Sequence, residues 1–152
     1  MHKDKRGFTT IELVIIVIII FILSSILIAT LSGIRQRERN DTRISDIKTI
    51  QTNLESYYAN AGFYPSLTEM NNPNWTTKNL KQLPGGDLVE PSSKTGIQDF
   101  TLSIQRGSFT YYVTDATGKT NCNNKTIACE QYVLSVKLEG NAGTYSVKSL
   151  NS

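Results

Sequence analysis

One carboxylate, Glu12, is the residue most able to do chemistry in the first part of this 152-residue chain. It stands within an apolar run, where the only other polar side chains between residues 11 and 31 are Ser24, Ser25 and Thr30. A charged carboxylate in an apolar medium costs several kcal/mol unless it is neutralised or paired with a cation. The position of Glu12 therefore predicts that its carboxylate pairs with a cation. The alternative is that the side chain faces lipid headgroups and has no specific role.

The two cysteines, Cys122 and Cys129, are the second candidates for chemistry. The chain's one histidine, His2, lies far away in sequence, and two cysteines without a nearby histidine are a poor zinc site. A disulfide between them would stabilise the fold by about 2–3 kcal/mol and would require an oxidising compartment. The pair therefore favours a disulfide in an extracytoplasmic C-terminal region, with two free buried thiols as the alternative.

Residues for catalysis are scarce elsewhere in the sequence. Gly85 and Gly86 lack the lysine that a phosphate-binding glycine loop needs. The carboxylates Asp87, Glu90 and Asp99 are typical of a solvated loop, although they could bind Ca²⁺. We therefore expect a protein that is not an enzyme and that has no metal and no cofactor.

A long helix must position Glu12. An apolar helix over residues 13–31 would rise about 28 Å, close to the ~30 Å hydrocarbon thickness of a bilayer, and so predicts a membrane span. The apolar run is longer than the roughly 7–15 residues of an ordinary secretory signal, so we do not expect ordinary signal-peptide cleavage. Lysines and arginines flank the run on both sides, so charge alone leaves its orientation undecided.

The same helix is expected to continue beyond the apolar run as an amphipathic segment. Apolar residues at three-to-four spacing predict a buried stripe: Ile44, Ile47, Ile50, Leu54, Tyr57, Tyr58 and Ala61. No proline stands between Phe8 and Tyr64, and Gly62 suits the residue that follows a helix end. The arginines of this segment have two interpretations, a solvated helix face or ion pairs with neighbouring copies: Arg35, Arg37, Arg39 and Arg43.

The rest of the chain predicts a small β-rich cap. Prolines and glycines indicate loop and short turns over residues 63–97. Strands are expected over residues 100–105, 108–114, 131–139 and 144–150. In the third of these, alternation predicts one buried face, made of Tyr132, Leu134, Val136 and Leu138. The predicted fold is α+β: a long N-terminal helix with a membrane-spanning first half, packed by its second half against a small antiparallel sheet.

The stretch KRGFTTIEL, followed by the apolar run, resembles the class III signal of type IV pilins and of the pseudopilins of type II secretion. In that family a membrane peptidase cuts after the glycine, here Gly7, and the new N-terminal residue, here Phe8, is methylated on its amine. The family's glutamate falls on Glu12. The stretch ESYYANAGFYPSL is similar to the end-of-helix segment of major pilins and pseudopilins, and the cysteine pair to the disulfide-bounded region of many pilins.

The resemblance implies a division of the chain and a way to assemble it. Residues 1–7 would be a leader, 8–33 a transmembrane and filament-core helix, 34–61 its amphipathic second half, and 62–152 a globular head. Glu12 would take the Phe8 amine of an axially displaced neighbour, so that only the correct stagger satisfies the charge. Copies that repeat such a non-closing contact would form a helical homopolymer.

The expected function is a structural subunit of a type IV pilus for adhesion or twitching motility. The first alternative is a pseudopilin of a type II secretion-like system, and the second is a non-polymerising single-pass membrane protein with an extracytoplasmic binding domain. Expected partners are other copies, the prepilin peptidase and methyltransferase, an inner-membrane assembly platform, minor pilins and the membrane. The chain would lie in the cytoplasmic membrane, with its N-terminus cytoplasmic, before assembly and in a surface pilus afterwards.

Net charge gives no indication of nucleic-acid binding. Of the formal +3, the leader contributes +2 through Lys3, Lys5 and Arg6 against Asp4, which leaves +1 for the mature chain. Nonspecific binding to phosphates relies on a concentrated basic surface, which this balance does not provide. We therefore expect no nucleic-acid partner.

Overall fold

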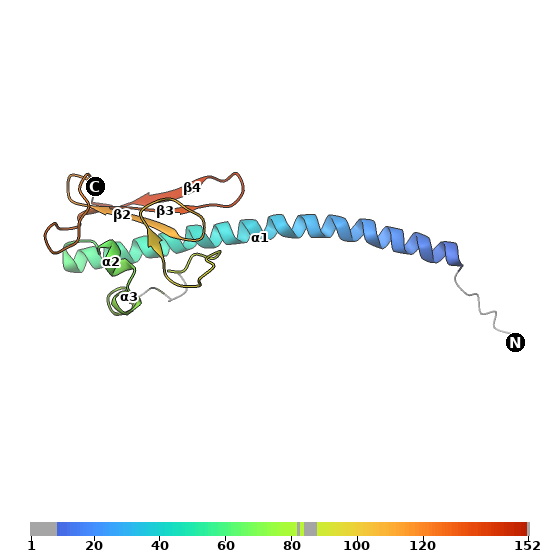
Figure 1. Cartoon of the computed structure of the whole chain (residues 1–152), viewed down its shortest axis with the longest axis horizontal. Helices are drawn as coiled ribbons and strands as arrows, with labels where there is room; N and C mark the ends of the chain where they lie inside the picture. Colours follow the sequence, from blue (N-terminus) through green and yellow to red (C-terminus); the bar gives the residue numbers. More distant parts are fainter. Residues whose placement is uncertain (1–8, 82, 84–87, 152) are drawn as a thin grey trace. The chain divides into compact units, whose positions relative to one another are not determined.

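The computed structural model describes residues 9–81, 83 and 88–151, with the backbone alone for residues 26–31 (Figure 1). The chain divides into two units, Met1–Arg37 and Glu38–Ser152, and the second is called the head from here on. Helix α1 (Thr10–Ala61) contributes to both units. No helix among the described residues combines the length and the apolar character that crossing a membrane requires.

The predicted continuous helix is confirmed over the described residues. The structure places α1 over Thr10–Ala61, without a break at Gly33. Gly62 then adopts a φ of 79°, which costs glycine nothing, and its N–H donates to the Tyr58 carbonyl at 2.7 Å. Gly62 therefore ends the helix as the sequence predicted.

The head contains one four-stranded sheet. In spatial order it consists of β1 (Phe100–Thr101), β2 (Phe109–Thr114), β3 (Gln131–Lys137) and β4 (Thr144–Lys148) (Figure 1). The β2–β3 and β3–β4 pairs are antiparallel, as expected. The β1–β2 pair is parallel, so the sheet is predominantly rather than wholly antiparallel.

Strand β1 is much shorter than the sequence predicted. The expected strand over residues 100–105 stops after Thr101, because the following residues turn back towards the start of β2. The turn is fixed by the Ser103 carbonyl, which accepts from the hydroxyls of Thr101 at 2.8 Å and Thr110 at 3.2 Å. Alternation of apolar residues alone could not reveal this turn.

The core lies between α1 and the sheet. The helix stripe buries Ile47, Ile50 and Leu54 completely, with Ile44 and the two tyrosines at its ends partly buried. The predicted face of β3 is also confirmed as buried, in the residues Tyr132, Leu134, Val136 and Leu138. The predicted α+β fold, with the second half of the helix packed against a small sheet, is therefore the observed one.

Two short helices occupy part of the segment that was expected to be loop and turns. Helix α2 (Leu67–Met70) begins with a capping box, in which Ser66 and Glu69 each bind the other's backbone N–H. Helix α3 (Pro73–Asn79) begins after Asn72, whose side chain accepts from two backbone N–H groups, and has Pro73 at its first position. Proline here starts a helix, which the sequence interpretation had treated only as a breaker.

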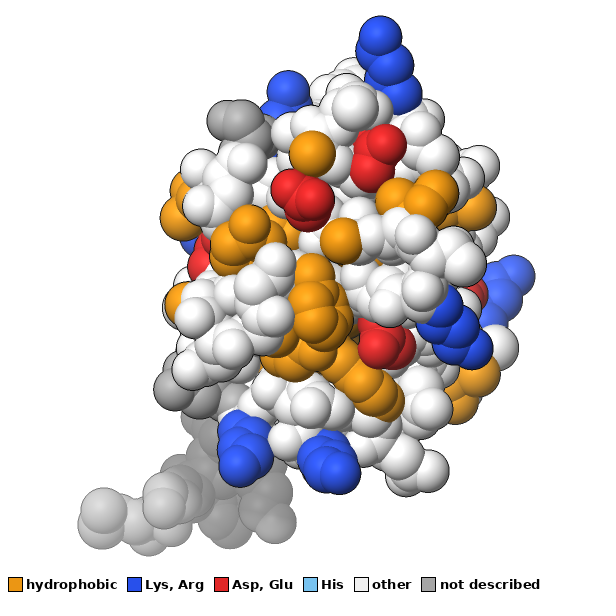
Figure 2. Space-filling model, turned by 90° about the vertical axis from the view of Figure 1, so that its left-hand side faces the viewer, with side chains coloured by type: hydrophobic (Ala, Val, Ile, Leu, Met, Phe, Trp, Pro, Cys, Tyr) orange, Lys and Arg blue, Asp and Glu red, His pale blue; other side chains and the backbone are white. Residues whose placement is uncertain are grey.

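The two short helices complete the head on the side of α1 away from β4 in Figure 1. Figure 2 views the end of the head at which α1 stops. Apolar side chains gather near the centre of this face, and lysine and arginine side chains lie around its rim.

Candidate functional site

Glu12 has a partner within its own chain. Its carboxylate accepts from the backbone N–H and the hydroxyl of Thr9, both at 3.3 Å, and its own N–H donates to the Thr9 hydroxyl at 3.3 Å. This reciprocal arrangement is a capping box at the start of α1. The spacing Thr-x-x-Glu is typical of a capping box, so the sequence already indicated this contact, although the sequence analysis did not predict it. The predicted pairing of Glu12 with the Phe8 amine of a neighbour stays a prediction, and Gly7 and Phe8 lie outside the described residues.

The first unit exposes a continuous apolar surface. Every side chain from Leu13 to Leu23 is exposed, from 43% for Ile16 to 77% for Phe21. A helix that is apolar on all sides is normally buried, either in a large core or in lipid. This segment therefore needs a cover that one copy of the chain does not supply.

An ion-pair cluster joins the part of α1 at the start of the head to two segments that are distant in sequence, one around Glu90 and one around Glu139. Arg43, whose side chain is 1% exposed, donates through Nε to Glu90 and forms an ion pair through Nη2 with Glu139 at 2.8 Å. Arg39 grips Glu139 with two parallel hydrogen bonds, of 2.7 Å from Nε and 2.5 Å from Nη2. The Ser92 hydroxyl accepts from Arg43 and donates to Glu90. The cluster therefore holds the 90–92 loop and the end of β3 against α1.

This cluster corrects two expectations. Arg43 does not lie on a solvated helix face. It also does not depend on a neighbouring copy for its ion pairs, because its carboxylate partners, Glu90 and Glu139, belong to its own head. Glu90 is 3% exposed and is not a solvated loop charge. The expectation of a solvated face holds for Arg35 and Arg37, which are exposed. Sequence reasoning missed the cluster because its members lie 47 to 100 residues apart.

Glu139 is the member of the cluster whose ionisation depends most clearly on its partners. The hydrogen bonds from Arg39 and then Arg43 lower the pKa of Glu139 from 4.5 to about 2, against an opposing effect of desolvation. A carboxylate with a lowered folded-state pKa stabilises the fold above its unfolded-state pKa and loses that contribution as the pH falls through the folded-state value.

We expect the head to lose stability between about pH 4.5 and pH 2 partly through Glu139. The variant Glu139→Gln, which has no carboxyl to titrate, should show a flatter dependence of the free energy of unfolding on pH in this window. Urea unfolding followed by the fluorescence of Trp75 measures this dependence. An unchanged slope in the variant would contradict the assignment.

A second carboxylate, Glu55, gathers donors at the end of the head where α1 stops. It accepts from the hydroxyls of Tyr64 and Tyr132, both at 2.8 Å, and from the Leu150 N–H at 3.2 Å. Burial raises the pKa of both tyrosines above the ordinary value, and the hydrogen bonds to Glu55 add to this effect. The tyrosines are thus structural donors that fix the C-terminal residues to α1.

The predicted disulfide between Cys122 and Cys129 is present. Its loop is tied to the head through Asn124, whose amide donates to the Tyr64 carbonyl at 2.8 Å and whose carbonyl accepts from the Cys129 N–H at 2.9 Å. Asn124 has a φ of 58°, in the left-handed region that asparagine tolerates better than most residues. The disulfide and Asn124 together hold this loop in place.

Replacing both cysteines by alanine is expected to lower the free energy of unfolding by about 2–3 kcal/mol, because the unfolded chain loses a crosslink. Thermal unfolding of the oxidised protein, the reduced protein and the variant measures the effect. Reduction should reproduce the loss in the natural protein and leave the variant unchanged. If reduction destabilises the variant as well, the disulfide is not the source.

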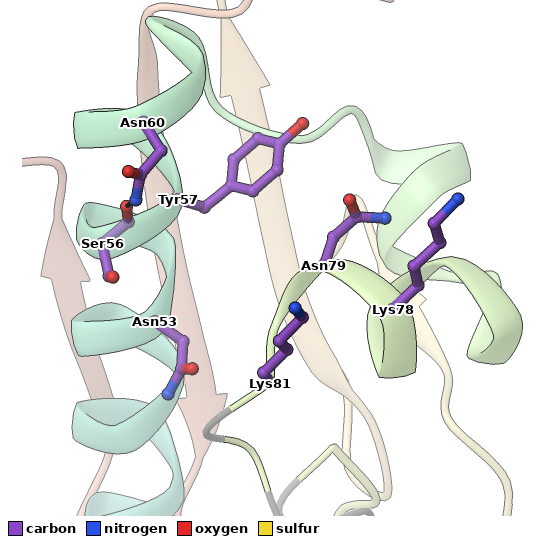
Figure 3. A pocket seen from close by; sticks show the side chains of 7 residues that line it. All are labelled: Asn53, Ser56, Tyr57, Asn60, Lys78, Asn79 and Lys81. Carbon is purple, nitrogen blue, oxygen red and sulfur yellow. Dashed lines mark hydrogen bonds between the residues drawn. The ribbon is translucent and has the colours of Figure 1, made fainter.

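A hollow of about 550 Å³ lies on the head between α1 and α3 (Figure 3). The Tyr57 ring extends into it from α1, and Asn79 and Lys81 extend into it from the other side. The amide groups of Asn53 and Asn79 donate to carbonyls of their own helices, at 3.0 and 2.8 Å. The described residues that line it are Asn53, Ser56, Tyr57, Asn60, Lys78, Asn79 and Lys81.

The described residues also include no group of three or more His, Cys, Asp or Glu side chains that could hold a metal ion. Asp87, one of the carboxylates considered for calcium, lies outside the described residues. Glu90 is committed to Arg43 and Ser92. The candidate functional features are thus the apolar surface of the first unit, Glu12, and the ion-pair cluster at the start of the head.

Comparison with known proteins gives relatives that are all named type II secretion system core protein G. The chain is 28% identical to the protein of Klebsiella michiganensis over 98 residues, 64% of this chain and 63% of that protein. It is 27% identical to the protein of Pectobacterium carotovorum over 90 residues, 59% of this chain and 52% of that protein. For Dickeya chrysanthemi the identity is 27% over 66 residues, 43% of each chain. The chain thus spans about half the length of these relatives, and no protein-family model and no solved structure matches it.

Proposed function

We propose that this chain is a structural, non-enzymatic subunit of a type II secretion-like pseudopilus, which polymerises through its N-terminal helix. The observation that carries polymerisation is the exposed apolar surface from Leu13 to Leu23, which requires a cover that other copies can supply. Its heterologous, repeated burial gives a filament with the heads on the outside. Before assembly, the same segment would hold the subunit in the cytoplasmic membrane.

The names of the relatives support one kind of filament over the other. Their shared name supports a secretion subunit, the first alternative weighed from the sequence, better than an adhesive or motility pilus. The self-contained head, fixed by the Arg43 cluster and the disulfide, suits a part that is carried as a rigid body. The partners proposed for it are other copies, a prepilin peptidase that cuts after Gly7 and methylates Phe8, and the assembly platform of a secretion system.

Mass spectrometry of the N-terminal peptide in native cells tests this proposal. The expected result is a peptide that begins with methylated Phe8, recovered from membranes and absent from sheared surface material, together with loss of protein secretion when the gene is deleted. The same peptide in sheared surface filaments, with secretion intact, would instead favour a pilus. An intact leader in the native cell would overturn the polymerising function and favour a single-pass binding protein.

A further inference from the structure

A pocket lined mainly by cations lies beside the first residues of α1 that belong to the head. This basic pocket, of about 470 Å³, is lined by Arg39, Arg43, Arg106, Lys137 and Glu139, with Pro91 and Ser92 at its side. Glu90 is bound to Arg43 beneath it. Four cations against two carboxylates leave an excess of two positive charges at this one place.

The excess charge resides on two particular side chains. Arg39 and Arg43 already bind carboxylates through the hydrogen bonds described above. Within the described part of the chain, the side chains of Arg106 and Lys137 have no hydrogen bond and no ion pair. Arg106 is exposed and Lys137 is half-buried, so both are available to an incoming anion.

A second hollow continues the positive surface. It measures about 460 Å³, shares Ser92 and Arg106 with the basic pocket, and adds Lys94. Its one carboxylate is Asp99. Arg106 therefore stands between two hollows that each contain a further lysine.

Apolar side chains accompany these cations. Leu102 and Ile104 precede Arg106 in the same turn and are 53% and 52% exposed, and Ile97, close to Lys94 in sequence, is 62% exposed. Exposed leucine and isoleucine beside cations suit the boundary between lipid headgroups and acyl chains.

The pocket also lies close, along the chain, to the end of the apolar segment. Arg39 follows Ile34, the last large exposed apolar residue of that segment, by five residues, or about 7.5 Å of helix rise. If the apolar segment is in a membrane, as proposed above, the chain leaves the lipid only a few residues before the first residue of the basic pocket.

We infer that the basic pocket binds the phosphate of an anionic phospholipid headgroup, with Arg106 and Lys137 as the binding cations. This inference rests on the proposed function for the membrane-bound stage of the subunit. The guanidinium of Arg106 can bind two phosphate oxygens at once, and Lys137 adds a point charge. The site would orient the head at the membrane surface before the subunit joins a filament.

Amine labelling of the full chain in lipid nanodiscs tests the site. Discs of phosphatidylcholine alone are compared with discs that also contain phosphatidylglycerol, and the reactivity of each lysine is read by mass spectrometry. Phosphatidylglycerol is expected to slow the labelling of Lys137 about fivefold, the effect of one cation at an anionic surface, and to slow that of Lys94 less. Lys119, just before the disulfide loop, and Lys125, within it, should label equally in both discs.

Two variants that each remove two positive charges distinguish binding at this site from nonspecific attraction between the chain and anionic lipid. Arg106→Gln/Lys137→Gln removes the two binding cations, and Lys119→Gln/Lys125→Gln removes two cations elsewhere on the surface. The first should reduce the phosphatidylglycerol that co-purifies with the chain about twenty-five-fold and abolish the lipid dependence of Lys94 labelling. The second should behave as the natural chain does. Equal losses in both variants would overturn the site.

The remaining outcomes are equally informative. If inorganic phosphate protects Lys137 in phosphatidylcholine discs, the ligand is free phosphate and not lipid. If protection in phosphatidylcholine discs grows with the number of chains per disc, the occupant is a second copy, which also overturns the inference. A chain that enters neither kind of disc contradicts the membrane-bound stage of the proposed function, whereas equal insertion without protection contradicts the lipid site alone.

Discussion

Replacing Arg43 by alanine is expected to lower the free energy of unfolding of the head by about 3–5 kcal/mol. The change leaves Glu90 buried, with one of its two partners, Ser92, and no compensating cation. It also removes one of the two arginines that hold Glu139. A loss of this size is a large fraction of the roughly 5–15 kcal/mol that stabilises an ordinary domain.

Unfolding in urea, followed by the fluorescence of Trp75 in the full chain, measures this loss. The double variant Arg43→Leu/Glu90→Leu leaves no unpaired charge and should recover most of the stability, because an apolar pair often replaces a buried ion pair without cost. Arg37→Ala, at an exposed position of the same helix, should stay within about 0.5 kcal/mol of the natural chain. A loss below about 1 kcal/mol for Arg43→Ala would mean that the cluster is open to solvent.

Replacing Glu12 by alanine is expected to leave a processed subunit that scarcely assembles. If Glu12 pairs with the amine of a neighbouring subunit, each contact loses about 3 kcal/mol, which corresponds to more than a hundredfold in the equilibrium. Quantifying crosslinked multimers and monomers in native membranes measures this effect. Processing of the leader should continue, because the glutamate lies beyond the cleavage position.

The capping box seen at Thr9 and Glu12 supplies the controls for this experiment. Glu12→Gln keeps the geometry of the box, since glutamine also serves at this position, but removes the charge. Thr9→Ala removes the box and keeps the charge. Pairing with a neighbour predicts failure of Glu12→Gln and assembly of Thr9→Ala. The reverse pattern would show that Glu12 acts only within its own helix.

The sequence was sufficient for the parts of the fold that depend on local patterns. The absence of proline and the spacing of Ile47, Ile50 and Leu54 predicted the helix and its buried stripe. Alternation predicted the buried face of β3, and Gly62 predicted the end of α1. These features follow from periodicity and backbone preference, which act over a few residues.

Features that depend on distant residues were missed. Neither Arg43 nor Glu90 differs in sequence from an ordinary surface charge, and only the fold brings them together. Helix α3 was missed for a different reason, because Asn72 and Pro73 were taken as loop residues although together they form a helix start. Glu12 is an example of both. Its capping box with Thr9 follows from a local sequence pattern that was missed. Its proposed partner, the Phe8 amine, belongs to another copy of the chain.

The two edge strands of the sheet, β1 and β4, have a consequence for heads that pack against one another. Both edges of the sheet are poor templates for further strand pairing: β1 has two residues, and β4 is short and ends in the exposed Lys148. Long, flat, apolar edges fuse neighbouring sheets, whereas short and charged edges resist this. Heads packed side by side along a filament would thus stay separately folded, so that the filament could come apart into intact subunits and be built again.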